Sequence, residues 1–194
     1  MRFTVLACVL ALAGASFDYT GKASLEDVTK FFALNQATFL YERSYSRQVS
    51  GKDMECIYMC TIKQPTTSEI QLEHGFFHEG KVTNYQLEIK LSRGPLLDDA
   101  PEMEAFYAGG LQKSMKRRYH FHYYDPQAMC AAITFTDSDG VLRCELHIRN
   151  AGKKDPSTNC KREYQYLCPN RITYLAYPSS GCTYPPRGHE AERP

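Results

Sequence analysis

The chain of 194 residues contains no tryptophan, so any aromatic surface for a ligand must come from its 14 tyrosines and 10 phenylalanines. It also has no Asn-x-Ser/Thr sequon, and N-glycosylation is therefore not expected. Nucleophile elbows, phosphate-binding loops and His-Glu-x-x-His helices are absent as well. We therefore expect no catalytic residue and no cofactor, and the sequence favours a binding protein over an enzyme.

A charge excess is missing too. The formal net charge is +1, from 23 basic and 22 acidic residues, and it falls to zero if Arg2 is removed with a leader. A nucleic-acid-binding protein would show a basic surface, so no nucleic acid partner is expected. We interpret the one local basic cluster as a solvated strand end rather than a binding patch; it consists of Lys113, Lys116, Arg117 and Arg118.

The apolar run at residues 3–12 is much shorter than the roughly 20 residues that span a bilayer. It follows a basic start and precedes Ala13-Gly14-Ala15, which is the pattern of a signal peptide. We predict a signal peptide at residues 1–15, one domain at residues 16–182 and a disordered tail at residues 183–194. The protein is expected to be secreted, extracellular, monomeric and without a membrane partner, in an oxidising compartment where cysteines pair.

Eight segments with strand character succeed one another and are separated by turn residues: 38–46, 55–63, 69–78, 82–92, 104–108, 116–124, 129–136 and 141–149. Several of them alternate, as Leu87, Ile89 and Leu91 do with polar neighbours. Such alternation is typical of antiparallel strands with one buried face. The series predicts an all-β fold, an eight-stranded antiparallel barrel whose interior can hold one small ligand.

Two helices are expected to flank the barrel. Ser24 can cap a short N-terminal helix over residues 24–32, with acidic residues in its first turn. Asp155 and Pro156 predict the start of a second helix that ends at residue 167. One face of the second helix should pack on the outside of the barrel, because it carries Cys160, Tyr164, Leu167 and Cys168.

Seven of the eight cysteines follow the leader. The turn at residues 137–140 would place Cys130 opposite residue 147, three positions from Cys144, so these two cysteines should not bond to each other. Each can reach the second helix instead. This geometry favours the pairs Cys130–Cys160 and Cys144–Cys168 and leaves Cys182 to bond either Cys56 or Cys60.

Six short motifs follow one another in a specific order: Tyr41-Glu42-Arg43-Ser44-Tyr45, Asp53-Met54-Glu55-Cys56, Cys130-Ala131-Ala132-Ile133, Cys144-Glu145-Leu146, Asn159-Cys160 and Cys182. In this order, over nearly all of the mature chain, they resemble the tick salivary lipocalins of the histamine-binding protein family. The resemblance implies a lipocalin barrel with an N-terminal and a C-terminal helix. Members are secreted and sequester small host mediators such as histamine, serotonin, leukotrienes or thromboxane, and some bind a complement protein.

The resemblance also bears on the cysteines and on the ligand. It implies the bonds Cys56–Cys182 and Cys130–Cys160, with Cys144–Cys168 as an additional bond, and leaves Cys60 as a thiol that is either buried or intermolecular. Amine-binding members carry Cys-Asp where this chain has Cys130-Ala131, and Glu-Leu-Trp or Glu-Leu-Tyr where it has Glu145-Leu146-His147. Since a buried ammonium group needs anionic or aromatic partners, Glu145 alone would make a weaker amine site.

The last predicted strand carries the first candidate site. Arg143, Glu145 and His147 share one face and Cys144 lies on the other. Because Cys144 should face the outer helix, the three polar side chains should point into the barrel. An error of one residue in the register would leave all three in solvent.

The first predicted strand carries the second candidate site, with Phe39, Tyr41, Arg43 and Tyr45 on one face. A buried arginine among aromatic rings suits a carboxylate-bearing lipid, although it could equally form a structural salt bridge beneath the cavity. The remaining candidates for the cavity wall could also be ordinary core residues; they are Tyr85, Tyr119, Phe121 and Tyr123.

Histidines and cysteines also raise the question of a metal. His120 and His122 should point the same way from a strand, but no third ligand has a recognisable spacing, and the same holds for His74 and His78. The Cys56-x3-Cys60 spacing lacks a second zinc-binding pair. We therefore expect hydrogen-bonded or solvated histidines and no metal.

Three functional hypotheses follow. An amine scavenger would use Glu145 with Tyr and Phe faces, whereas an eicosanoid scavenger would hold a carboxylate with Arg43 or Arg143. In the third, a vestigial cavity accompanies outer loops that contact a host protein such as a complement component. In the first two the partner is a small host mediator, bound in a preformed cavity.

Overall fold

The computed structural model describes residues 22–96, 99–108, 117–149 and 156–184. The predicted signal peptide, Lys113, Lys116, Asp155 and residues 185–194 of the predicted tail lie outside these ranges. Within them, no helix is long and apolar enough to cross a membrane.

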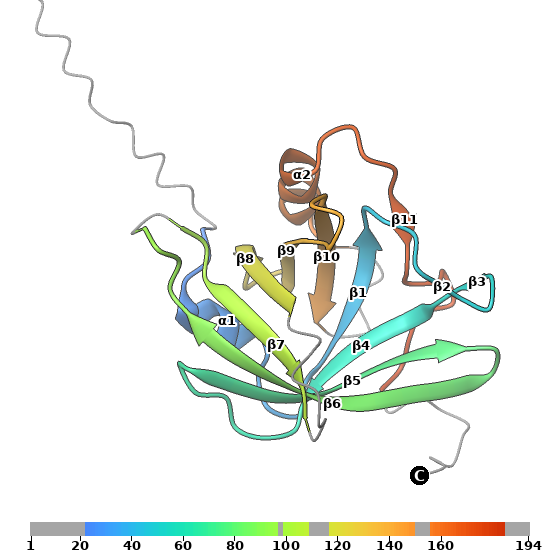
Figure 1. Ribbon diagram of the computed structural model, residues 1–194, viewed down its shortest axis with the longest axis horizontal. Helices are drawn as coiled ribbons and strands as arrows, with labels where there is room; N and C mark the ends of the chain where they lie inside the picture. The colour runs from blue at the N-terminus through green and yellow to red at the C-terminus, as the bar shows by residue number, and fades with distance from the viewer. Residues whose placement is uncertain (1–21, 97–98, 109–116, 150–155, 185–194) are drawn as a thin grey trace, which may run out of the picture.

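The core of the structure is a closed antiparallel barrel of eight strands, in which each strand pairs with the next and β1 pairs with β10 (Figure 1). This architecture confirms the predicted fold class. The strands are β1 (Ala37–Arg43), β4 (Glu55–Thr61), β5 (Glu69–His78), β6 (Lys81–Ser92), β7 (Glu102–Tyr107), β8 (Arg117–Asp125), β9 (Cys130–Thr136) and β10 (Leu142–Arg149). Three short strands lie beside the barrel. β2 (Gln48–Val49) and β3 (Lys52–Asp53) pair with each other and were not predicted, whereas β11 (Tyr174–Leu175) pairs with β1 and lies within residues 171–177, where the sequence predicts a final short strand.

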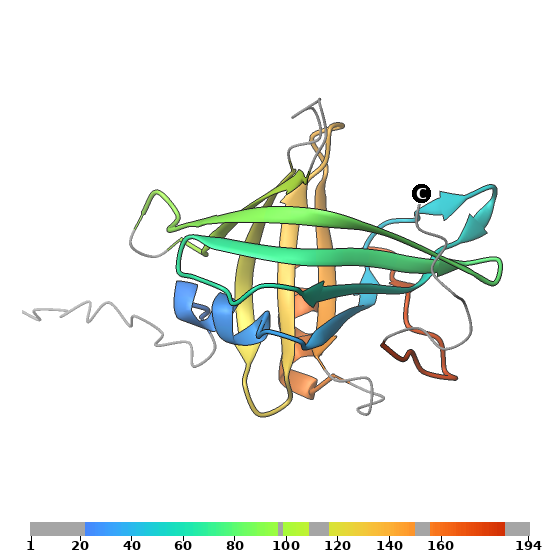
Figure 2. The same ribbon diagram turned by 90° about the horizontal axis from the view of Figure 1, so that it is seen from below.

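The first helix, α1 (Leu25–Phe31), closes one end of the barrel. Its cap is the predicted one, because the Ser24 side chain accepts a hydrogen bond from the Asp27 backbone and Asp27 accepts one from Ser24. Phe31 and Phe32 are buried in a cluster with inward residues of β5 to β9. Figure 2 shows α1 at the end of the barrel away from the β9–β10 hairpin, so a ligand would have to enter near that hairpin.

The second helix, α2 (Thr158–Leu167), packs outside the barrel against β8, β9 and β10. Its N-cap is Ser157, whose side chain accepts a hydrogen bond from the Cys160 backbone. The prediction that Asp155 is the cap is therefore wrong. A serine cap fits better, because its side-chain oxygen reaches the N3 amide while Pro156 stays outside the helix.

Three disulfides hold the C-terminal part of the chain to the barrel. Cys130–Cys160 and Cys144–Cys168 fasten α2 to β9 and β10, and Cys56–Cys182 fastens the C-terminal segment to β4. These are the predicted bonds, and Cys60 is a buried free thiol. Tyr184, at the start of the predicted tail, packs against the Tyr58 ring with 5.2 Å between ring centroids.

The β9–β10 hairpin differs from the prediction by one residue. Thr136 lies opposite Leu142 and Cys130 opposite Ile148, not residues 141 and 147. The Asp137 amide donates a hydrogen bond to the Val141 carbonyl, so the loop includes one more residue than expected. The prediction that Cys130 and Cys144 do not bond to each other is still correct, because Cys144 lies opposite Thr134, four residues from Cys130.

Two strands contain bulges that change which side chains face inward. In β1 the pairing with β10 shifts between Leu40 and Glu42, and in β8 the pairing with β9 shifts between Phe121 and Tyr123. An inserted residue reverses the alternation beyond it. The inward and outward faces of these two strands therefore differ from a strict period of two.

Candidate functional site

A cavity in the barrel lies above Phe32 of the α1 cluster. Its volume is about 50 Å³, which is room for a few water-sized groups. Most of its wall is apolar, and the polar exceptions are Tyr45, Arg47, His74, Tyr119, Glu145 and His147. The cavity shares residues with an outer chamber of about 610 Å³, which is bordered by the β9–β10 turn residues Asp137 and Ser138.

Glu145 is the central polar group of the cavity and is only 7% exposed. It reaches the interior from β10, where the neighbouring Cys144 points outward to its disulfide with α2. The Tyr45 hydroxyl donates to Oε1 of Glu145, and Nε2 of His147 lies 2.8 Å from Oε2. Nδ1 of His147 is buried and has no hydrogen-bond partner within the described ranges. The carboxylate is thus oriented from two sides.

The surroundings keep Glu145 charged. Burial by itself would raise the pKa of this carboxyl, but the hydrogen bond and the positive charge of His147, the hydrogen bond from Tyr45 and the charge of Arg117 together lower it below its ordinary value. The opposite holds for the phenols nearby. Burial and the Glu145 charge raise the pKa of Tyr45 well above its ordinary value and that of Tyr119 to about 12, so both keep their protons.

An aromatic wall marks the junction of the cavity and the outer chamber. His74 and Tyr119 border both spaces, whereas Tyr85 and Tyr107 border the outer one. The His74 ring stacks on Tyr85 with 4.9 Å between centroids, and Tyr85 contacts Tyr107 at the same distance. Burial, aided by the charge of Arg47, lowers the pKa of His74 to about 4, so its ring is neutral at physiological pH.

The two predicted arginines do not line the cavity. Arg143 turns toward the hairpin, where Nη2 lies 2.6 Å from Oδ2 of Asp139 and Nε lies 3.8 Å from Asp137. Arg43 is buried on the inner side of β1, donates from Nη2 to the Arg47 carbonyl at 3.1 Å and lies 3.8 Å from Asp53. These contacts match the structural alternative for Arg43 rather than a place on the ligand wall.

The predicted aromatic residues divide between several places. Tyr45 and Tyr119 line the cavity, Tyr85 lies in the outer chamber, and Phe121 packs on Phe31 at the closed end. The other three predicted aromatic residues were expected in the cavity, and this prediction is wrong. Because of the two bulges, their side chains pack on the outer side of the barrel wall. They are Phe39, Tyr41 and Tyr123, and their cluster includes Tyr164 of α2 and Tyr177.

Two polar residues of the cavity wall, Arg47 and His74, were not predicted to lie there. His74 could have been found from alternation, since the buried Ile70 and Leu72 precede it at intervals of two on β5. Arg47 follows β1 in an irregular segment, where no periodic pattern indicates a direction.

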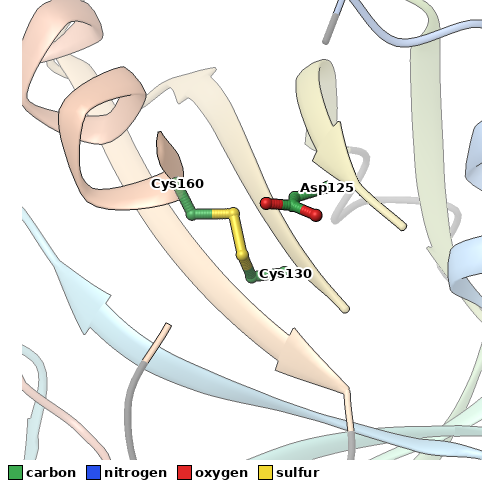
Figure 3. A group of neighbouring side chains, drawn as sticks. All are labelled: Asp125, Cys130 and Cys160. Carbon is green, nitrogen blue, oxygen red and sulfur yellow. A yellow bond between two sulfur atoms is a disulfide. The ribbon is translucent and has the colours of Figure 1, made fainter. Parts of the chain in front are cut away.

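A cluster of metal-ligand types has a structural explanation. Asp125, Cys130 and Cys160 lie within 4.8 Å of one another, as Figure 3 shows, but the two sulfurs are bonded to each other. Asp125 accepts hydrogen bonds from Ser157 and from the Gln127 backbone, so it fixes the turn and the start of α2.

The two neighbouring histidines of β8 also have structural contacts. The rings of His120 and His122 are 6.1 Å apart, and Nε2 of His122 lies 2.8 Å from the Thr134 hydroxyl. Burial and the neighbouring His120 lower the pKa of His122 to about 4. These contacts agree with the expectation of hydrogen-bonded histidines.

An eight-stranded barrel that is closed at one end by a helix and surrounds a mostly apolar cavity with a few polar groups has the architecture of a lipocalin. Among solved structures, an odorant-binding protein aligns with a TM-score of 0.50 and 12% identity, covering 79% of this chain and 93% of that one. Lobster apocrustacyanin A1 aligns with a TM-score of 0.47 and 9% identity, covering 81% and 89%. No curated protein sequence matches the chain.

The family is shown by a sequence model of the tick histamine binding protein, which matches residues 18–184. The chain belongs to the tick histamine-binding protein family. Members of this family are carriers of small ligands and not enzymes. Three disulfides fit an extracellular protein.

Proposed function

We propose that this protein is secreted and sequesters a small host mediator of the biogenic amine class, whose ammonium group pairs with Glu145. The observation that carries the proposal is an ionised carboxylate, 7% exposed, on the wall of an otherwise largely apolar cavity. Among the described residues no arginine or lysine lies within 4 Å of the carboxylate, and the one basic group that does is the imidazole of His147, which carries a charge only when it is protonated. A ligand cation would therefore complete the pair.

The arrangement around Glu145 suits an ammonium group in particular. Such a group has three N–H donors, and the carboxylate oxygens can accept more than the two hydrogen bonds that they receive. The phenol ring of Tyr119 supplies an aromatic face of the kind that cations prefer. Tyr119 thus supplies an aromatic contact in place of the aromatic residue of amine-binding members.

Titration calorimetry of the protein with histamine and serotonin tests the proposal, with Glu145→Gln as the variant. Glutamine keeps the shape and one acceptor oxygen for the Tyr45 hydroxyl but removes the charge, so affinity is expected to fall about a hundredfold. The matched control is Glu163→Gln, because Glu163 is a buried carboxylate of α2 outside the barrel. Equal affinity of the wild type and the Glu145→Gln variant would remove Glu145 from the site.

An eicosanoid remains a second candidate, with a different anchor from the one predicted. Arg47 and Arg117 border the outer chamber above an apolar cavity, so a lipid carboxylate could stay at the mouth while its hydrocarbon chain enters. In this case leukotriene would bind in calorimetry and Glu145→Gln would not weaken it. Burying the uncompensated charge of Glu145 against a hydrocarbon chain is costly, and this favours the amine.

A further inference from the structure

Residues 174–177, here called the C-terminal strap, fill a gap between two barrel strands. One edge of β1 pairs with β10, and the other pairs with β4 over residues 37–39 but with β11 at residues 42–43. Figure 1 shows β1 and β4 diverging, with β11 between their far ends. The Ala176 amide donates to the Tyr41 carbonyl of β1 at 2.9 Å, and its carbonyl accepts from the Cys56 amide of β4 at 3.1 Å. The strap therefore completes the barrel wall where β1 and β4 no longer pair.

The strap lies directly behind the wall of the cavity. Ala176 is 1% exposed and packs in one cluster with Leu40, Met54 and Ile57. The same three side chains line the cavity. If the strap left its place, these side chains would lose their backing and water would reach them from outside the barrel. The cavity would then open sideways, between β1 and β4.

A single disulfide, Cys56–Cys182, fastens the end of the chain that carries the strap to β4. This bond is the most accessible of the three. Cys56 is partly exposed, whereas the four cysteines of the other two bonds are at most 5% exposed. A reductant reaches an exposed disulfide more readily than a buried one. Cys56 also has a φ of 48°, a left-handed conformation that is unfavourable for a residue with a Cβ atom, and release of the strap would let it relax.

We propose that Cys56–Cys182 is a redox-labile bond whose reduction releases the strap and opens the cavity from the side. A dithiol reductant attacks the sulfur of Cys56, the S–S bond breaks, and Cys182 leaves as a thiol. The second thiol of the reductant then closes the reductant's own disulfide, and Cys56 leaves as a thiol. Two electrons and two protons thus pass from the reductant to the protein. Faster loss of a bound amine would follow, and this consequence rests on the proposed function, whereas the opening does not.

The first experiment measures which bond is reduced first. The folded protein is treated with dithiothreitol for increasing times, new thiols are alkylated, and the labelled peptides are quantified by mass spectrometry. Cys56 and Cys182 should be alkylated about tenfold faster than the four cysteines that bond α2 to the barrel, because access governs the rate. Equal rates at all three bonds would overturn the proposal.

The second experiment measures the release of the strap in the variant Cys56→Ser/Cys182→Ser. Hydrogen exchange at the Ala176 amide and oxidation of Met54 by hydrogen peroxide should both be about tenfold faster than in the wild type, while amides of β8 and β9 keep their protection. The matched control is Cys144→Ser/Cys168→Ser, which also lacks one disulfide but keeps the bond of the strap. Its exchange at Ala176 and oxidation at Met54 should equal those of the wild type.

Serotonin should also dissociate about tenfold faster from the first variant than from the control, as stopped-flow fluorescence would show. An Ala176 amide that stays protected in the folded first variant would overturn the release, and unchanged oxidation of Met54 would overturn the opening. Serotonin that binds the wild type and leaves both variants at one rate would show that the strap does not retain a ligand, while the amine site stands. If serotonin does not bind the wild type, the proposed function fails, and exchange and oxidation still decide the inference.

Discussion

Acidification should destabilise the fold through His74, with a size that follows from its burial. The pKa of its side chain is lowered from 6.5 to about 4, mainly by burial, with Arg47 adding to the shift and Glu145 opposing it. Between these two values the unfolded chain binds a proton that the folded protein does not. The free energy of unfolding therefore decreases as the pH falls from 6.5 toward 4.

The expected loss between pH 7 and about pH 5 is about 2 kcal/mol for His74, from the free energy of binding one proton to the two states. His122 has a similarly lowered pKa and should contribute a similar amount. Glu145 does not obscure the effect: since its folded pKa is below the ordinary carboxyl value, the stability that it contributes is lost at lower pH.

Urea unfolding followed by far-ultraviolet circular dichroism, with the disulfides intact, measures this loss. Because the substitution His74→Phe also changes the stability at pH 7, the quantity to compare is the change in the free energy of unfolding between the two pH values. That change should be smaller by about 2 kcal/mol in the variant than in the wild type. An equal change in the two proteins would show that the His74 ring is protonated as readily in the folded state as in the unfolded chain.

Two further predictions concern the frame of the barrel. Replacing Cys144 and Cys168 by serine opens a loop with a sequence separation of 24, which should lower the free energy of unfolding by about 3.5 kcal/mol in the loop-entropy treatment, measured by denaturant titration. Gly75→Ala would place a Cβ atom 2.5 Å from the Tyr58 ring and should cost about 1–3 kcal/mol; in a Tyr58→Ala background the same change should cost much less, as a double-mutant cycle would show.

The eight strands could be predicted because alternation and turn residues are local signals. The disulfides to α2 could be predicted for a related reason, since the face of β10 that carries Cys144 is set by a period of two. The same reasoning turned Glu145 and His147 inward, and both line the cavity. In a strand without a bulge, side chains alternate strictly, so one residue known to face outward shows which of its neighbours face inward.

The sequence could not indicate where that period is interrupted. Phe39 and Tyr41 were expected in the cavity, but the β1 bulge between Leu40 and Glu42 leaves both outside, and the β8 bulge does the same to Tyr123. A bulge needs one extra residue opposite its partner strand, and any residue with a compatible backbone can provide it. The position of a bulge depends on how the strand pairs with its neighbours in the barrel, and the sequence of one strand does not specify that pairing.

The residues that follow the β1 bulge explain why no arginine pairs with Glu145. The bulge restores Arg43 to the inner side, directly opposite Glu145 of β10, where a salt bridge between the two would neutralise the cavity. The Arg43 guanidinium lies 5.6 Å from the centroid of the Tyr45 ring and donates to the Arg47 carbonyl, while the Tyr45 hydroxyl donates to Glu145. Tyr45 therefore contacts both charged groups and satisfies the carboxylate without cancelling its charge. The negative charge remains available to a ligand cation because a neutral phenol occupies the place that a paired arginine would take.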